Sequence, residues 1–178
     1  VKPGFFLQFL PLDPGVLAGA GDYARVAIGA GSDHIAIEQF DAQSAGDTVM
    51  GFGEGWHELE YNPSTGRLWR WTSDRATLRI HSRRRPLVLR LRGTFETRAS
   101  AAHVTVRVGA QVVSEQDVPT EFSLDVGIPA ELVASDGETA VTVETDQWYV
   151  PAETNWRPTA DRRRLGLRIY ECEVVAAR

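Results

Sequence analysis

Residues 104–114, VTVRVGAQVVS, decide the fold class of this chain. Valines alternate with polar residues over 104–108, which is the two-residue period of a half-buried β-strand. Gly109 and Ala110 interrupt that pattern, and a second β-branched run follows over 111–114. Two such runs joined by two residues that include a glycine predict a β-hairpin.

The same alternation recurs on both sides of this hairpin. Further strands are predicted at residues 23–29, 34–40, 67–71, 76–80, 87–91, 122–128, 140–145 and 165–175. Helical patterns are confined to single turns at 13–20 and 129–134. About ten short strands separated by Gly, Pro and Asp turns indicate an all-β protein, an antiparallel β-sandwich or jelly roll. Residues 41–55, 61–66 and 149–164 are predicted to be irregular.

The length of 178 residues fits one domain. We expect residues 23–178 to form a single β-sandwich domain and residues 1–22 to form an apolar N-terminal segment. That segment begins with Val1 and carries a run of large apolar side chains at 5–10. It resembles a cut end of a longer protein. We expect the apolar run either to pack on the domain itself or, as a juxtamembrane linker, to lie near a membrane surface or a neighbouring domain.

The net charge of −5 argues against a nucleic-acid partner, because phosphates require a clustered basic surface. The basic run at 83–85 precedes Pro86 and fits a solvated turn. Cys172 is the single cysteine, so an intrachain disulfide is excluded, and its apolar surroundings indicate a small buried side chain. One cysteine does not fix the redox compartment.

The stretch 51–80 concentrates aromatic side chains, Trp56, Tyr61, Trp69 and Trp71, among charged ones. Aromatic faces cover the apolar C–H face of a sugar, and carboxylates and guanidinium groups bond its hydroxyls. The same inventory also builds an ordinary core with a salt-bridged rim. The charged members are Glu54, Glu58, Glu60, Arg67, Arg70 and Arg75.

A second group of aromatic and charged residues surrounds the loop at 149–164. There Asp161 is followed by three arginines, a pattern that suits a structural ion pair in which the aspartate also accepts backbone N–H bonds. If the chain has a ligand site, we expect both regions to contribute to it. The candidate ligand-binding residues are Trp56, Glu58, Tyr61, Arg70, Trp148, Trp156 and Arg163.

Catalytic and metal chemistry find little support in the sequence. His57 and Glu60 are two ligands where zinc needs three or four. Glu58 and Glu60 would lie on one face of a strand, whereas glycoside hydrolysis needs carboxylates that flank the bond. Cys172 has no histidine partner in sequence, and no nucleophile elbow is present. We therefore expect no catalytic residue, no resident metal and no cofactor, with calcium on loop carboxylates left open.

Several motifs together resemble a soluble β-sandwich domain of bacterial membrane-bound glycosyltransferases. They are Gly-Trp-His-Glu at 55–58, Gly-x-x-x-Arg-Trp-Thr at 66–72, Ala-x-Leu at 76–78, Pro-Ala-Glu at 151–153 and Asp-Arg-Arg-x-Leu-Gly-Leu-Arg at 161–168. The enzymes concerned are similar to the protein mannosyltransferase and aminoarabinose transferase superfamily. Related domains with a Trp-Arg-Trp signature resemble carbohydrate-binding modules.

The resemblance implies a non-catalytic accessory domain on the extracytoplasmic face, attached to the membrane-spanning part of the same polypeptide. It implies a glycan or a lipid-linked sugar as partner, and it transfers no catalytic residue, since the catalytic acid of that superfamily lies between membrane helices. The alternative is a structural module that docks on a partner domain, with Trp56, Trp69 and Trp71 in the core. An enzyme would require two facing carboxylates or a metal.

Overall fold

The computed structural model describes residues 15, 27, 29, 31, 47–135, 137–155 and 159–177. Contacts divide the chain into two compact units, Val1–Leu7 with Ala45–Arg178 and Gln8–Ser44. Several expectations fall outside the described residues, apart from isolated positions: the domain boundary after residue 22, the apolar run at 5–10, the helical turn at 13–20 and the strands at 23–29 and 34–40.

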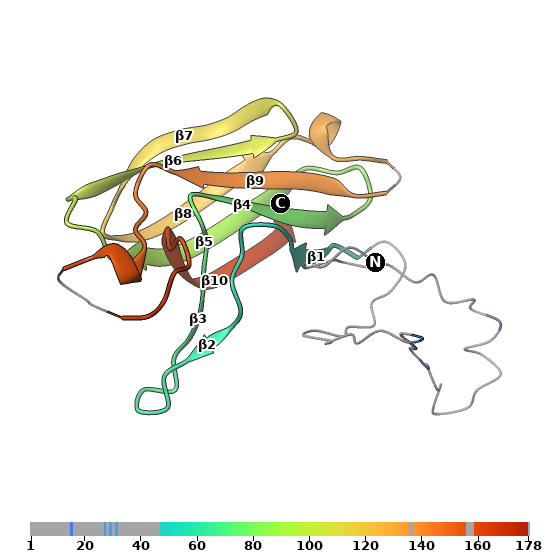
Figure 1. The fold of residues 1–178 in the computed structure, drawn as a ribbon. Helices are drawn as coiled ribbons and strands as arrows, with labels where there is room; N and C mark the ends of the chain where they lie inside the picture. The colour runs from blue at the N-terminus through green and yellow to red at the C-terminus, as the bar shows by residue number, and fades with distance from the viewer. Residues whose placement is uncertain are drawn as a thin grey trace. The chain divides into compact units, whose positions relative to one another are not determined.

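The larger unit is a sandwich of two five-stranded sheets in which every pairing is antiparallel (Figure 1). One sheet has the order β1 (Val49–Phe52), β4 (Arg75–His81), β9 (Thr139–Thr145), β6 (Ala101–Val108) and β7 (Gln111–Pro119). The other has the order β2 (Glu60–Tyr61), β3 (Leu68–Trp71), β10 (Leu167–Ala176), β5 (Leu87–Phe95) and β8 (Glu121–Ile128). Two 3-10 turns complete the elements, η1 (Ala130–Leu132) and η2 (Pro151–Glu153).

The predicted fold class, an antiparallel β-sandwich with short helical turns, is confirmed. The hairpin predicted at residues 104–114 is β6–β7, which lies at the edge of its sheet, and Gly109 occupies its turn at a φ of 58°. Two strands, β1 and β2, fall where the pattern predicts no strand. β2 has only two residues, and β1 has glycine and methionine in place of an alternating β-branched run, so neither carries the period-two signal.

The core lies between the sheets because alternate residues of each strand point inward. In β8 the burial alternates residue by residue, and in β5 the inward positions are Leu87, Leu89, Leu91, Gly93 and Phe95. Each of these apolar side chains is at most 1% exposed. Burying such side chains contributes about 1.5–3 kcal/mol each, which makes the inter-sheet layer the main source of stability.

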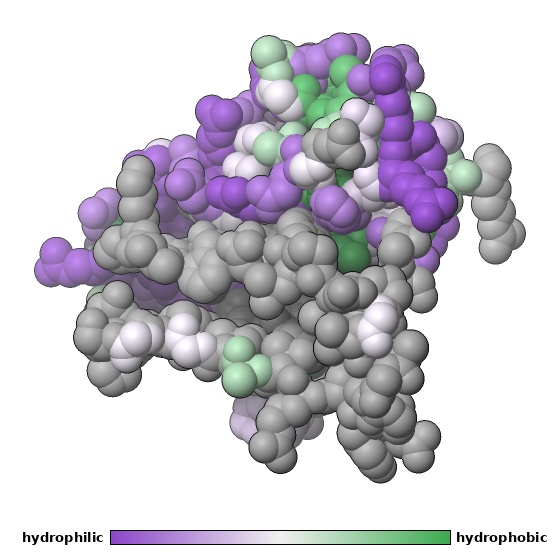
Figure 2. Space-filling view, turned by 90° about the vertical axis from the view of Figure 1, so that its right-hand side faces the viewer, coloured by the Kyte–Doolittle hydropathy of each residue, from purple (hydrophilic) through white to green (hydrophobic). Residues whose placement is uncertain are grey.

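The outward positions of the second sheet carry charges that pair across strands. Arg90 contacts Asp125 at 3.8 Å and Glu173 at 3.7 Å, while Arg92 contacts Glu171 at 3.4 Å. Figure 2 shows one face of the molecule, on which hydrophilic side chains cover much of the described surface and apolar side chains lie between them. Exposed pairs of this kind contribute about 0–1 kcal/mol each, so they fix register and solubility more than stability.

The sequence predicts a buried side chain at Cys172. Cys172 is half-buried and packs against the core, and desolvation raises the pKa of its thiol to about 12. It is therefore a neutral packing side chain at physiological pH, as expected. Among the described residues, no helix has the length and apolar character needed to cross a membrane.

His103 joins β6 to the neighbouring edge strand β7 and makes stability depend on pH. Its ring nitrogens lie 2.8 Å from Asp117 and 3.1 Å from Glu115, and the hydrogen bond to Asp117, followed by that to Glu115, raises the pKa of His103 above 6.5. The stabilisation is therefore complete below pH 6.5 and is lost as pH rises through the higher folded pKa.

We expect urea unfolding to show wild type more stable than His103→Gln at about pH 5.5 and the two proteins to converge at about pH 9. The double variant Asp117→Asn with Glu115→Gln should show the same loss of pH dependence. Equal differences between wild type and His103→Gln at both pH values would contradict this role.

Candidate functional site

Strand β3 separates two environments. Trp69 and Trp71 point to the outer face of their sheet, whereas Arg70 points inward, is 9% exposed and lies 4.6 Å from the ring centroid of Phe52. The two tryptophans, two residues apart on one strand, therefore share a face, and Arg70 occupies the other. Arg70 therefore faces the interior between the two sheets. The two indoles lie on the opposite face of their sheet.

Strand β10 brings a second guanidinium beside these indoles. Arg168 pairs directly with Trp71 in the register of β10 and β3, and its guanidinium lies 3.9 Å from the ring centroid of Trp69. Its Nη1 donates to Glu96, which follows β5, at 2.6 Å. Both side chains are about one-fifth exposed. This ion pair is therefore better shielded from water than the exposed pairs that Arg90 and Arg92 make on the same sheet.

The connection between β9 and β10 covers the indoles. Tyr149 and Leu165 pair in an isolated bridge through two backbone hydrogen bonds of 2.9 and 2.8 Å. Together with Trp71 they form a small apolar cluster, in which Tyr149 meets Trp71 edge-on at 6.2 Å. The Tyr149 hydroxyl donates to Glu96 at 3.3 Å, which links this cluster to the Arg168 ion pair.

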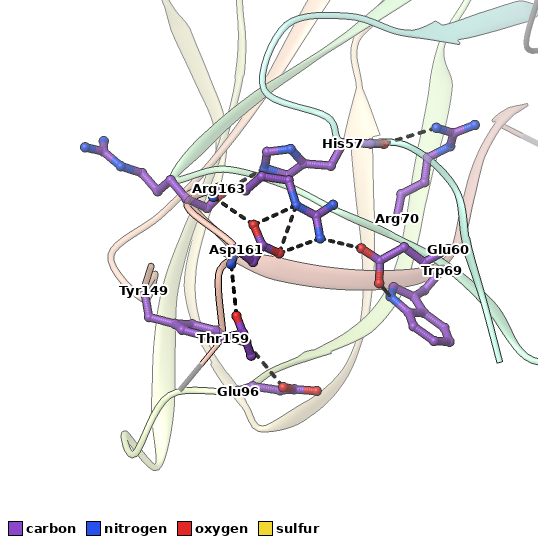
Figure 3. Close-up of polar contacts among 10 residues, drawn as sticks. His57, Glu60, Trp69, Arg70, Glu96, Tyr149, Thr159, Asp161 and Arg163 are labelled. Atoms are coloured by element: carbon purple, nitrogen blue, oxygen red, sulfur yellow. Dashed lines mark hydrogen bonds and ion pairs between the residues drawn. The ribbon is translucent and has the colours of Figure 1, made fainter. Parts of the chain in front are cut away.

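Arg163 is the central charged group of the site, as Figure 3 shows. Its Nη2 donates to Asp161 at 2.7 Å and to Glu60 at 2.8 Å, and Glu60 also accepts from the Trp69 indole at 2.9 Å. The hydrogen bond from Arg163 lowers the pKa of Asp161, and Asp161 in turn raises the pKa of Arg163. Asp161 also accepts the backbone N–H of Arg163, so the predicted structural ion pair is confirmed.

These side chains surround a cavity of about 150 Å³. Its floor is apolar and its walls carry carboxylates and guanidinium groups from both halves of the sequence. The lining residues are Glu60, Trp69, Trp71, Glu96, Tyr149, Pro151, Thr159, Asp161, Arg163, Leu165 and Arg168. Aromatic rings beside fixed polar groups of both kinds form an arrangement that can hold a polyhydroxylated ring.

One donor in the cavity wall has no partner within the described part of the chain. The Nε of Arg168 is buried and makes no hydrogen bond. A buried unsatisfied donor costs about 1–3 kcal/mol, so an acceptor oxygen that reached it from the cavity would recover that energy.

The structure distributes the predicted ligand residues over several places. Arg163 lines the cavity, whereas Trp56 is 3% exposed and packs edge-on against Phe52 in the main core. Arg70 donates to the backbone carbonyl of His57 at 3.1 Å on the inner face. Trp56 and Arg70 therefore do not join Arg163, because β3 and the core residues separate them from the cavity.

The remaining candidates lie on the surface or outside the described residues. Tyr61 is 59% exposed on β2, and Glu58 is exposed just before it. Trp148 is 43% exposed, and the Arg164 guanidinium covers one face of its ring at 4.2 Å. Trp156 falls in the gap at 156–158.

Sequence reasoning did not select several cavity residues. The indoles of Trp69 and Trp71 are visible in the pattern, but which face they occupy depends on the strand beside them. Glu96 follows one predicted strand and Arg168 lies in another, and the two meet only because β5 and β10 are neighbours. The sequence did show that aromatic and charged residues are concentrated in two segments, and both segments contribute residues to the cavity lining.

The next feature is the arrangement of side chains that could ligate a metal. Within the described residues, no three His, Cys, Asp or Glu side chains are grouped so that they could hold a metal ion. His57, one of the two zinc candidates, instead bonds through Nε2 to the backbone carbonyl of Arg164 at 2.8 Å. Calcium on loop carboxylates stays a prediction.

No protein-family model and no curated protein matches this chain. A solved family 35 carbohydrate binding module from Clostridium thermocellum matches with a TM-score of 0.38 and 13% identity, covering 74% of this chain and 93% of that chain. At this score the similarity assigns neither a function nor a residue to this chain.

The ion pair between Glu60 and Arg163 should couple β2 to the loop before β10. In a double-mutant cycle with Glu60→Gln and Arg163→Gln, we expect a coupling energy of about 0.5–1 kcal/mol, since both side chains are partly exposed. Urea unfolding of the four proteins measures it. Strictly additive single effects would show that the pair contributes nothing.

Proposed function

We propose that this domain is a non-catalytic carbohydrate-binding module and that the glycan binds in the cavity lined by Trp69, Arg163 and Arg168. The supporting observation is the cavity itself, whose lining combines indole and phenol rings with paired carboxylates and guanidinium groups. Carboxylate and guanidinium side chains held by one another are pre-organised, so binding a hydroxyl costs little side-chain entropy.

The wider context of the proposal comes from the sequence. The motif segments at 66–72, 151–153 and 161–168, which carry the resemblance to membrane-bound glycosyltransferases, supply most of the cavity lining. We therefore extend the proposal to an accessory domain of such an enzyme, placed on the extracytoplasmic face, whose ligand is a glycan or a lipid-linked sugar. The transferase chemistry would belong to another part of the polypeptide.

Glycan binding is tested with a microarray of arabino-, manno-, gluco- and galacto-oligosaccharides of two to six residues, followed by calorimetric titration of the retained sugars. Trp69→Ala should weaken binding at least tenfold, about 1.4 kcal/mol, because it removes a ring from the wall. Glu60→Gln should also weaken binding, and it preserves the shape of the side chain if the larger change unfolds the protein.

Trp148→Ala is the matched control, because it removes an exposed indole that lies outside the cavity lining. It should leave affinity within about twofold. A loss of binding in Trp148→Ala with no loss in Trp69→Ala would move the site to the exposed Trp148–Arg164 stack. Absence of retained sugars would favour the structural module, in which Trp69 and Trp71 serve packing alone.

The membrane context has its own test. An antibody raised against this domain should detect the native polypeptide in the membrane fraction of the source cells, resistant to alkaline carbonate washing. Detection in the soluble fraction would contradict attachment to a membrane glycosyltransferase while leaving glycan binding untouched.

A further inference from the structure

We infer that the cavity takes one neutral sugar ring at the end of a glycan chain, an inference that rests on the proposed function. It narrows the ligand class in two respects, the position of the ring within the chain and its charge. The first follows from the size and floor of the cavity, and the second from the balance of charges in its walls.

The volume of about 150 Å³ is the first argument. That space fits one sugar ring better than two. It is also well below the roughly 300 Å³ at which pockets for larger ligands begin. A ligand with several rings can therefore place only one of them inside.

The floor of the cavity supplies the second argument. Trp71, Tyr149 and Leu165 are 4%, 8% and 3% exposed, and together they form a packed apolar cluster. A chain cannot continue through such a layer, so the ring that enters must be a terminal one. An open groove along a sheet, by contrast, would accept internal rings and would gain affinity with each added residue.

Charge supplies the third argument. Three carboxylates and two guanidinium groups line the cavity, so negative charges outnumber positive ones by one; they belong to Glu60, Glu96, Asp161, Arg163 and Arg168. Each guanidinium already binds carboxylates of the wall. An acidic sugar would add an anion beside three carboxylates, whereas a neutral hydroxyl adds no charge to them.

The experiment takes an oligosaccharide retained by wild-type protein and alters one terminal ring at a time. The first derivative is capped by O-methylation at the non-reducing end, and the second is reduced to the alditol at the other end. The third carries a uronic acid in place of the terminal ring at whichever of these two ends proves sensitive. We expect one of the first two changes to weaken binding at least tenfold and the other to weaken it less than twofold. The uronic acid should bind at least tenfold more weakly than its neutral parent.

Glu60→Gln reports on the charge argument independently of folding. Because it removes one carboxylate and keeps the side-chain shape, it should narrow the preference for the neutral sugar over the uronic acid at least threefold. An unchanged preference would overturn the charge argument.

Other outcomes are separable from failure of the proposed function. Tolerance of both caps, together with affinity that rises from two to six residues, would overturn terminal recognition and leave glycan binding intact. Tighter binding of the uronic acid would overturn neutrality alone. Absence of binding by every neutral oligosaccharide would remove the inference and the proposed function together.

Discussion

Replacing Gly55 with alanine is expected to destabilise the domain by roughly 3 kcal/mol or more. Gly55 has a φ of +82°, a conformation that costs a residue with a Cβ about 1–3 kcal/mol. An added Cβ would also lie 1.9 Å from the Arg75 carbonyl oxygen and 2.8 Å from the Ala76 Cα. Both obstacles are backbone atoms at the start of β4, so relief requires the strand to move.

The matched control is Gly66→Ala in the β2–β3 turn. Gly66 has a similar φ of +70°, but nothing lies within 4 Å of an added Cβ. It should cost only about 1 kcal/mol, the conformational part of the Gly55 effect. Urea unfolding measures both, with the midpoint reporting stability and the slope reporting the surface exposed. Equal losses in the two variants would show that β4 does not press against Gly55.

Phe95→Ala is expected to cost about 3–5 kcal/mol, the usual range for deleting a buried aromatic ring. Phe95 is 1% exposed at the end of β5 and belongs to the core cluster between the sheets. That cluster draws its residues from both sheets, so we expect the cavity left behind not to close without moving a strand. Urea unfolding at 25 °C measures the loss.

Val88→Ala on the same strand is its control. Val88 lies at an outward, half-buried position of β5, so its truncation should cost about 1 kcal/mol or less. A Phe95 effect as small as that of Val88 would contradict the assignment of inward and outward faces, and with it the sandwich.

Strands could be predicted from the sequence wherever one face is buried and the other is exposed to solvent. In β8 and β4 the side chains alternate between core and solvent, and the sequence shows that alternation directly. β2 could not be found, because two residues give no period. Sheet membership was also hidden: the turn at 72–74 joins β3 and β4, which belong to different sheets.

The sequence predicted which kinds of residue form the candidate site, but not which individual residues do so. Trp56 and Arg70 look like ligand residues because indoles and guanidinium groups often bind sugars. In the structure both pack against Phe52 of β1, which places them in the interior and not at the cavity. Glu96 and Arg168 meet through strand neighbours that are far apart in sequence, and local pattern carries no information about such pairings.

The most direct test of the account follows the indole N–H signals of the tryptophans in a ¹⁵N–¹H correlation spectrum during titration with a retained oligosaccharide. Trp69, whose indole donates to Glu60 in the cavity wall, should shift strongly, and Trp56, buried in the main core, should stay in place. A stationary Trp69 signal at saturating sugar, with shifts confined to Trp148, would contradict the claim that the cavity is where this domain holds its ligand.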